Sequence, residues 1–401
     1  MSVSTFNKNV KRLNRQEDNF FMKKVIIFIV LMFMSISAKG EIYNADAVNV
    51  SENLDLNIKN IEINGTPINL NITRHVQLSD PGGLYWKYSK AEIGLQMKTV
   101  QMQTFTYDES EPVDRHQLDI YYTEHSKQNK VILFVPGGAW RQGDKSLYEA
   151  LGNTLAGYHD FTVVVANYRL SNEEDGNALH PDHITDVAKA FAWVKNNISP
   201  YGNPARIYLF GQSAGAHLVS LLATDANYLK KVGYSLSDIK AVISMSGTYY
   251  LPDFVLTPNN PLGLTMEETV MYKAIMQGAF GGWSDTELVA PSPQVHINAG
   301  QPPFLVIYTY NDLSGFRQSA ENFVRAVKAI GTESSPAPEI SLRGIEFFDY
   351  TDDVWKSATD QAAKEPAMAS YVGHWAEVIA INPNEPAGYV TKLIVEFFQS
   401  H

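Results

Sequence analysis

From Val100 to the C-terminus, short apolar runs alternate with longer stretches that carry a helical pattern. Apolar, β-branched runs of this kind are typical of strands buried on both faces, and such strands separated by helices form a mostly parallel sheet. We therefore predict an α/β fold with helices on both faces of a mostly parallel central sheet. The expected strands are 117–122, 131–135, 162–166, 206–210, 241–245, 304–309 and 344–350. The expected helices are 146–156, 184–197, 214–223, 320–330 and 389–398.

The chain begins with a segment that has the pattern of a leader rather than of a folded domain. Two lysines precede an apolar run at 25–34, and small residues follow it up to Gly40. This is the order of a secretory signal peptide, and the run is too short to span a bilayer in the usual way. We expect residues 1–40 to hold an N-terminal extension and a signal peptide at about 22–40, so that the mature chain is secreted or periplasmic without a stable membrane anchor. The alternative is a retained anchor.

Two further segments stand apart from the alternating pattern, one before the catalytic domain and one within it. Residues 41–99 are predicted to form an N-terminal appendage, with one hairpin candidate at 61–66, where Asn-Gly suits a tight turn. The catalytic domain is expected at 100–401. Within it, the aromatic and Pro-rich stretch at about 248–299 is too long for an ordinary connection, and we expect it to form a cap over the active site. The alternative is a surface flap without substrate contact.

Composition excludes several kinds of chemistry. The chain has no cysteine, which removes thiol catalysis, disulfides and cysteine metal sites. Its formal net charge is −11 and no basic patch stands out, which argues against nucleic acid or an anionic membrane as a partner. Sequence motifs for metal or nucleotide binding are also lacking. A small, neutral substrate fits better, and we expect no cofactor. The oligomeric state is left open.

The segment Gly211-Gln212-Ser213-Ala214-Gly215 lies between an apolar run and a helical stretch. A serine hydroxyl is a poor nucleophile at neutral pH, so it must be held clear of the sheet, beside a base and near donors for the developing oxyanion. A strand, a sharp turn and a helix with glycines on both sides of the serine provide that position. Ser213 is therefore the predicted nucleophile.

An acid and a histidine should follow such a serine in chain order. Asp312 comes just after the expected strand 304–309, at the same sheet edge as Ser213. Only two histidines follow it, and His401 is the terminal residue, so His374 is the predicted general base. Asp312 would orient its imidazole and stabilise the imidazolium. Rival acids lie in the later loop, at Asp349, Asp352 and Asp353.

Donors for the oxyanion are expected after an earlier strand and directly after the serine. The loop Pro136-Gly137-Gly138-Ala139-Trp140 follows the strand 131–135, and its glycines let backbone N–H groups approach the reacting carbonyl closely. The alternative is an ordinary Pro-Gly turn. The predicted donors are the amides of Gly137, Gly138 and Ala214. Trp140 and Gln212, which adjoin the loop and the serine, are candidate substrate contacts.

These residues resemble the α/β-hydrolase fold, and within it the esterase branch of kynurenine formamidase-like and hormone-sensitive-lipase-like carboxylesterases. That branch carries an H-G-G-x-W loop followed by G-D-K. The matching segments here are Pro136 to Trp140, Gly143-Asp144-Lys145, Asn167-Tyr168-Arg169-Leu170, Asp186 with Ala190 to Val194, Ser292-Pro293, Pro302-Pro303 and Phe316 to Ser319. The resemblance runs from about Val100 to the C-terminus and implies a serine hydrolase with this triad.

The chain departs from the family pattern at two places. Pro136 stands where the family has a histidine that braces the oxyanion loop; proline has no N–H and a fixed φ, so a different brace is expected. Asp312 and His374 are 62 positions apart (374 minus 312), which is longer than is usual in the family, so we expect an insertion at 334–371.

We predict an exported serine hydrolase that cleaves carboxylic esters through an acyl-enzyme. Three alternatives remain. The bond could be an N-formyl amide, as in kynurenine formamidase-like enzymes, or a peptide, although no β-propeller precedes the domain. The chain could also be a hydrolase-shaped binding protein without turnover. Within the ester reading, removal of acetyl groups from polysaccharides stays open.

Overall fold

The computed structural model describes a defined part of the chain, in two compact units. One unit holds residues 1–80 and 349–372, and the other holds 81–348 and 373–401. The described residues are 52–63, 66–76, 97–110, 113–172, 177–255, 260–310, 312–332, 336–345, 370, 373–375, 378, 380–381, 383 and 388–401. The predicted leader at 1–40 and most of the expected insertion lie outside them.

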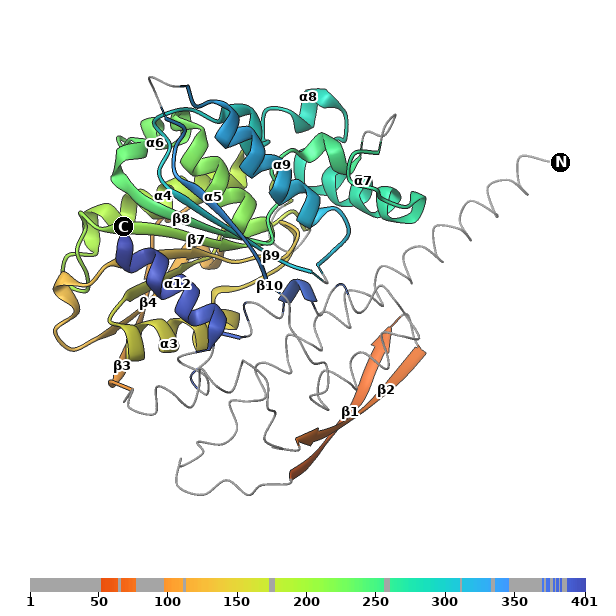
Figure 1. Ribbon diagram of the computed structural model, residues 1–401. Coiled ribbons are helices and arrows are strands. Elements are labelled where there is room, and N and C mark those ends of the chain that lie inside the picture. Colours follow the sequence, from red (N-terminus) through yellow and green to blue (C-terminus); the bar gives the residue numbers. More distant parts are fainter. Residues whose placement is uncertain are drawn as a thin grey trace. The chain divides into compact units, whose positions relative to one another are not determined.

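The second unit is built on an eight-stranded sheet with the order β10-β9-β8-β7-β5-β6-β4-β3 (Figure 1). All neighbours from β10 to β6 are parallel, whereas β4 pairs antiparallel with both β6 and β3. The strands are β3 (Val100–Thr106), β4 (Gln117–Thr123), β5 (Val131–Val135), β6 (Thr162–Ala166), β7 (Ile207–Gln212), β8 (Ile239–Met245), β9 (Phe304–Thr309) and β10 (Ile340–Ile345). This is the predicted α/β architecture, and the fold is that of the α/β-hydrolases.

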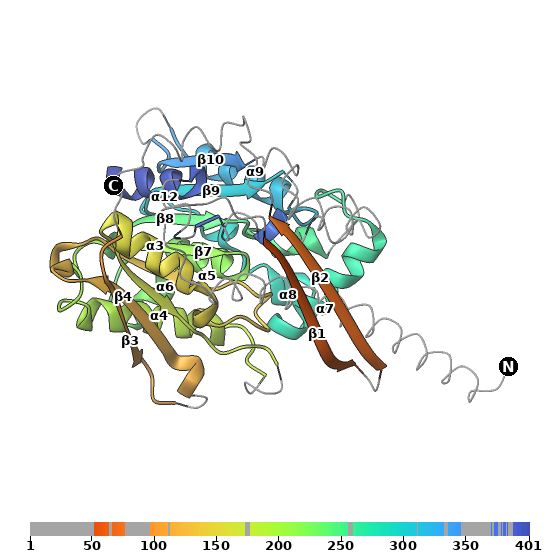
Figure 2. The same ribbon diagram turned by 90° about the horizontal axis from the view of Figure 1, so that it is seen from below.

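Helices cover both faces of this sheet. They are α3 (Glu149–His159), α4 (Asp182–Asn197), α5 (Ala214–Thr224), α6 (Ala226–Lys231), α7 (Met266–Phe280), α8 (Asp285–Leu288), α9 (Phe316–Ala329) and α12 (Tyr389–Ser400). Figures 1 and 2 both draw α3 beside α12, whose Phe398 packs against the rings of Tyr208 and Phe210 on β7. Because successive strand residues point to opposite faces, Leu209 between them joins the cluster on the other side.

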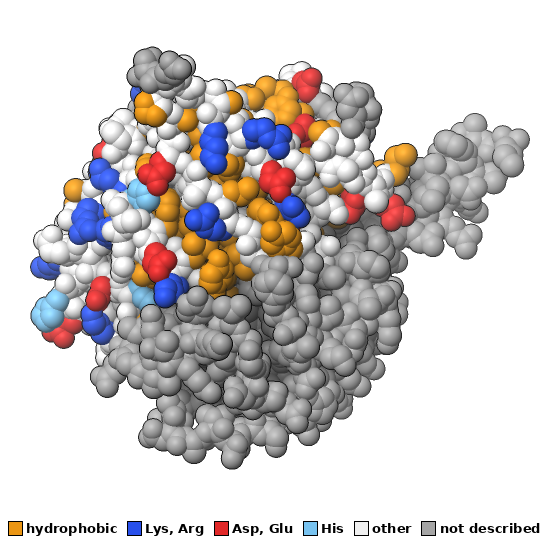
Figure 3. Space-filling view, viewed as in Figure 1, with side chains coloured by type: hydrophobic (Ala, Val, Ile, Leu, Met, Phe, Trp, Pro, Cys, Tyr) orange, Lys and Arg blue, Asp and Glu red, His pale blue; other side chains and the backbone are white. Residues whose placement is uncertain are grey.

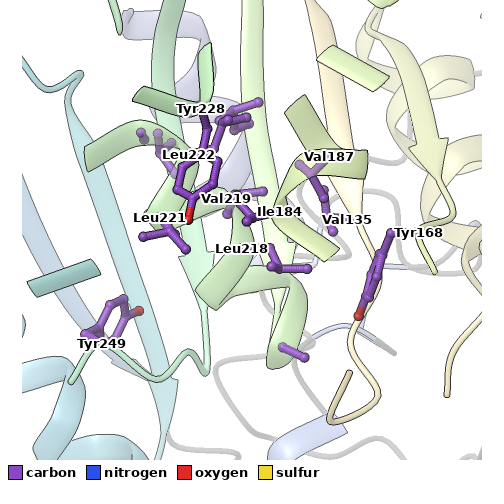
Figure 4. Close-up of a cluster of buried hydrophobic side chains, with 14 of the residues drawn as sticks. Val135, Tyr168, Ile184, Val187, Leu218, Val219, Leu221, Leu222, Tyr228 and Tyr249 are labelled. Carbon is purple, nitrogen blue, oxygen red and sulfur yellow. The ribbon is translucent and has the colours of Figure 1, made fainter. Parts of the chain in front are cut away.

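That second cluster is the core between the sheet and helices α4 and α5. Ile184 and Val187 of α4, Leu218 of α5 and Val135 of β5 lie together there (Figure 4). All eleven residues of α5 are buried, so this helix has no solvent face. An apolar helix packed directly behind β7 fixes the end of that strand, where Ser213 lies.

Most expected elements are found within one to four residues of their predicted bounds. The main shift is β10, which was expected at 344–350 and lies at Ile340–Ile345. It is an edge strand, so polar residues such as Ser341 and Arg343 interrupt its apolar pattern, and only pairing with β9 reveals it. The polar edge strand β3 and the short helix α6 were not predicted as elements.

The stretch expected to form a cap contains one long helix and three short elements in its described part. These are the 3₁₀ turns η6 (Leu251–Phe254) and η7 (Pro293–His296) and the helices α7 and α8. Helix α7 begins at a capping box between Thr265 and Glu268 and ends at Gly281, whose φ is +78°. The segment is therefore ordered structure with its own start and stop signals. Its role as a cap stays a prediction.

The first unit contains a β-hairpin. Strands β1 (Glu52–Ile63) and β2 (Thr66–Val76) pair antiparallel, with Ile63 opposite Thr66 across two intervening residues. The strand pairing predicted around 61–66 is present, and its strands are longer than the sequence indicated. The predicted turn residues 64 and 65 lie outside the described residues.

On the face of the molecule seen in Figure 3, acidic and basic side chains are interspersed over the described residues. On that face, neither positive nor negative side chains gather into a large patch. A search of the described part of the chain for a helix long and apolar enough to cross a membrane finds none.

Buried histidines make the stability of this unit depend on pH. Burial lowers the pKa of His217 and of His183 to about 3. An unfolded histidine titrates near pH 6.5, so between that pH and about 3 the unfolded chain binds a proton that the folded chain does not. Stability from these groups is present above pH 6.5 and is lost as pH falls.

We predict that His217→Gln removes one such group, because glutamine keeps a donor and an acceptor but does not titrate. The free energy of unfolding of the wild type should fall more steeply with acid than that of the variant, by up to about 1.4 kcal/mol per pH unit below pH 6.5. Urea unfolding at pH 7.5, 6.5, 5.5 and 4.5 measures this difference. His125→Gln, at a side chain that is 89% exposed, is the control. Equal slopes for wild type and His217→Gln would contradict the prediction.

Candidate active site

The predicted nucleophile lies at a sharp turn between β7 and α5. Ser213 has φ 56° and ψ −120°, a backbone conformation that side chains rarely adopt. Such a residue costs on the order of 1–3 kcal/mol and persists only when its surroundings determine it. The turn therefore holds the serine at the carboxyl end of β7, clear of the strand.

Glycines on both sides of Ser213 permit this turn because backbone atoms approach them closely. A Cβ on Gly211 would lie 2.3 Å from the carbonyl oxygen of Gly215, and a Cβ on Gly215 would lie 1.9 Å from that of Val135. Any side chain at either position would force the strand and the helix apart. The spacing of glycines in the sequence is thus a packing requirement.

Three side chains that are far apart in the sequence meet at this turn. The Nε2 atom of His374 lies 2.7 Å from Oγ of Ser213, and its Nδ1 atom lies 2.6 Å from Oδ1 of Asp312. All three residues are buried. An ionised carboxylate only accepts, so Nδ1 carries the proton of the neutral ring and Nε2 accepts from the serine hydroxyl. This is the geometry of a nucleophile, a general base and an orienting acid.

Backbone hydrogen bonds between neighbouring chain segments continue beyond the ends of the strands, next to the site. The amide of Ser213 donates to the carbonyl of Met245 at 2.9 Å, and the amide of Ser246 donates to that of Ile307 at 2.8 Å. Ser213, Ser246 and the loop with Asp312 therefore directly follow the neighbouring strands β7, β8 and β9, in that order.

The carboxylate of Asp312 is fully engaged by its neighbours. Oδ1 also accepts from the amide of Leu313 at 2.7 Å, and Oδ2 accepts from the hydroxyl of Ser246 at 2.5 Å. The ring of Phe316 meets the His374 ring edge-on at 4.8 Å. The hydrogen bonds hold the carboxylate in one orientation, and the aromatic contact leaves the imidazole little freedom to rotate.

The segment that carries His374 is tied to the strand ends by two side chains. Nε2 of Gln212 donates to the carbonyl of His374 at 3.0 Å, and the hydroxyl of Thr309 donates to that of Gly373 at 3.0 Å. His401 lies elsewhere, at the end of α12, where its ring contacts Phe397. The rival acids at 349, 352 and 353 lie outside the described residues.

The loop after β5 changes one of the predicted oxyanion donors. The amide of Gly137 donates to the hydroxyl of Tyr148 at 3.0 Å, so in this structure it is committed to a protein acceptor. Among the described residues, the amides of Gly138 and Ala214 have no hydrogen-bond acceptor. These two amides stay predicted oxyanion donors.

Trp140 and Gln212 are not placed as substrate contacts. Trp140 is 3% exposed; its indole donates to Nδ1 of His217 and its ring packs edge-on against Phe280. Gln212 is completely buried under Gly137 and holds the His374 segment. Both side chains are buried in this structure, and substrate contact by either residue stays a prediction.

Reasoning from the sequence missed Ser246, Thr309 and Tyr148. Ser246 follows β8, the neighbour of β7, and Thr309 ends β9, the strand beyond it. A search for polar residues at the carboxyl ends of these strands would have found both. Tyr148 has no comparable signal. In the described ranges, no three His, Asp or Glu side chains gather as metal ligands would.

Residues 118–325, rather more than half of the chain, match the family model BD-FAE. The chain belongs to the BD-FAE family. The match begins at β4 and ends within α9, so it includes Ser213 and Asp312, while His374 lies beyond it.

Curated relatives of this BD-FAE chain are esterases by name. It is 32% identical over 229 residues to a probable isoprenylcysteine alpha-carbonyl methylesterase of Arabidopsis thaliana, covering 55% of this chain and 46% of the relative. It is 32% identical over 241 residues to a probable carboxylic ester hydrolase of Mycobacterium tuberculosis, covering 54% and 53%. The chain thus spans about half the length of the curated relatives it matches.

Two solved structures have the same fold. An inhibited esterase B of Lactobacillus rhamnosis superimposes with a TM-score of 0.57 at 18% identity, covering 78% of this chain and 91% of that one. A bifunctional GH43-CE protein of Bacteroides eggerthii gives a TM-score of 0.52 at 20% identity, covering 75% and 35%. Both likenesses support the fold of the BD-FAE chain.

The close approach at Gly215 yields a test of the turn. We predict that Gly215→Ala lowers the free energy of unfolding by about 3 kcal/mol, because the new methyl group overlaps the carbonyl of Val135. Gly233→Ala is the matched control: its φ is +87° but nothing lies within 4 Å, so only backbone strain of about 1 kcal/mol is expected. Urea midpoints measure both. If Gly215→Ala is no less stable than Gly233→Ala, the packing argument is wrong.

Proposed function

We propose that this chain is an exported serine hydrolase that cleaves carboxylic esters through an acyl-enzyme. The observation that carries the proposal is the His374 ring, which lies within hydrogen-bond distance of Ser213 on one side and Asp312 on the other. Membership of the BD-FAE family and the names of the curated relatives support the ester as the bond that is cleaved.

In the proposed mechanism, His374 takes the proton of Ser213 as Oγ attacks the acyl carbon. The imidazolium that forms is stabilised by the Asp312 carboxylate at Nδ1. The tetrahedral intermediate then collapses, the C–O bond to the alcohol breaks, and His374 returns the proton to the leaving oxygen. Water repeats the sequence on the acyl-enzyme and releases the acid.

The amides of Gly138 and Ala214 are the proposed oxyanion donors. Each is a backbone N–H held by rigid structure, so little reorganisation is needed as the negative charge develops. Loss of one such donor typically lowers turnover about 10²–10³-fold. The geometry of the Pro136 loop should therefore matter almost as much as the base.

Ser213→Ala is predicted to abolish hydrolysis of p-nitrophenyl acetate and butyrate and to abolish labelling by a fluorophosphonate probe. His374→Gln should lower turnover by about 10⁴-fold or more, because the serine then has no base. His401→Gln and Ser235→Ala, both away from the site, are the controls. Hydrolysis that survives Ser213→Ala would contradict the proposal.

The same assay separates the alternatives. Faster turnover of N-formylkynurenine than of either ester would indicate an N-formyl amide hydrolase. A wild type that neither hydrolyses nor becomes labelled would indicate a binding protein of the same fold.

Export is proposed on the leader at about 22–40 alone. Expression of the full chain in a bacterium should yield mature protein that begins shortly after Ala38 or Gly40. N-terminal sequencing of protein from the periplasm or the medium measures this. Recovery of only the uncleaved chain from the cytoplasm would refute export and leave the hydrolase proposal intact.

A further inference from the structure

We infer that Tyr148 and Tyr168 act as a pair of positioning residues that set the oxyanion loop in this chain. The inference deepens the proposed function and rests on it. The two phenol groups hold opposite ends of one peptide unit, the bond between Pro136 and Gly137. They supply the brace that the loop needs where proline stands at position 136.

The loop requires a brace because its backbone is strained. Gly138, Ala139 and Trp140 have φ values of +126°, +52° and +58°, three positive values in succession. Two of these residues carry side chains, and each such conformation costs on the order of 1–3 kcal/mol. Without contacts from outside, the segment would relax and its amides would turn away from the reacting carbonyl.

The contacts on the Pro136–Gly137 peptide come from two directions. The hydroxyl of Tyr168 donates to the carbonyl oxygen of Pro136 at 3.1 Å. The amide of Gly137 donates to the hydroxyl of Tyr148 at 3.0 Å. Because a peptide unit is planar, fixing its C=O at one end and its N–H at the other fixes the orientation of the whole plane.

The peptide unit between Gly138 and Ala139 is fixed in a different way. The carbonyl of Gly138 accepts from the amides of Arg141 at 3.0 Å and Gln142 at 3.1 Å. The amide of Gly138 therefore lies between a plane held by two tyrosines and a carbonyl held by a tight turn. With both neighbours set, its direction is determined, and it is one of the two proposed oxyanion donors.

Both tyrosines are themselves held rigidly. Tyr148 is 2% exposed, its ring lies 4.6 Å from that of Phe134 on β5, and it also contacts the ring of Trp375, next to His374. Tyr168 is 2% exposed and contacts the ring of His183 edge-on. Burial raises the pKa of each phenol, so both stay protonated at the pH where the enzyme would work.

The two phenol groups bind the polar backbone groups that a proline at position 136 leaves available. Proline has no N–H, so the only polar group it offers is its carbonyl, which Tyr168 takes. Tyr148 receives the first N–H that follows. The substitution of histidine by proline is thus compatible with a defined loop.

The test compares Tyr148→Phe, Tyr168→Phe and the double variant with Tyr121→Phe. Tyr121 is a buried tyrosine on β4 that packs over Gly152, outside the loop. We expect kcat to fall about tenfold in each loop variant with KM within twofold, because the loop acts on the transition state. Affinity for a boronic acid that mimics the tetrahedral intermediate should fall by the same factor.

The double variant distinguishes a shared role from two independent ones. Because both hydroxyls hold one plane, loss of either one should free it, and the double variant should lose little more than a single variant. Tyr121→Phe should leave kcat and boronate affinity unchanged. A kcat unchanged by Tyr148→Phe, or losses that multiply in the double variant, would overturn the inference.

Hydrogen exchange gives a readout that does not need activity. Amide exchange in 136–143 should accelerate in Tyr148→Phe and not in Tyr121→Phe. If wild type hydrolyses no ester and equals Ser213→Ala, the proposed function has failed. In that case, amide exchange alone tests whether Tyr148 positions the loop. Unchanged exchange in Tyr148→Phe would refute that role.

Discussion

The strained turn at Ser213 is the constraint on which the site depends. Its φ of 56° persists because β7 is buried along its whole length and paired on both sides, while α5 is buried on all of its faces. Neither element can move to relieve the serine without opening the core. The burial that stabilises the domain therefore also holds the nucleophile in place, and the close contact at Gly215 is where the two meet.

The sheet then brings the partners of the serine to it. Parallel strands end at a common edge, and hydrogen bonds beyond β7, β8 and β9 extend their register into the loops. Ser246 links the acid to β8, and Gln212 and Thr309 link the base segment to β7 and β9. Each residue of the proposed triad is thus fixed to a strand end. A long connection between Asp312 and His374 is tolerated because the position of His374 depends on these links rather than on the length of chain before it.

The sequence predicted the interior of the fold well because buried strands need continuous apolar runs, as in β5 and β9. Half-exposed edges were harder, since β10 is defined by its pairing partner. Ser213, Asp312 and His374, which lie within hydrogen-bond distance of one another in turn, could be proposed from the sequence because chain order leaves few candidates. The free oxyanion amides could not, because whether Gly137 is available depends on the hydroxyl of Tyr148, which only the folded chain brings to it.

Motif residues around the site turn out to brace loops. Burial would raise the pKa of Asp186, but the pKa is lowered, first by the ring of His116 and then by the paired hydrogen bonds from Arg169. Arg115 donates to the carbonyl of Gly143 and to Asp144, and Asp144 in turn accepts from Asn167. These contacts hold the far end of the loop, whereas Tyr148 and Tyr168 hold its start. The departure at Pro136 therefore removes one support from an arrangement that has several.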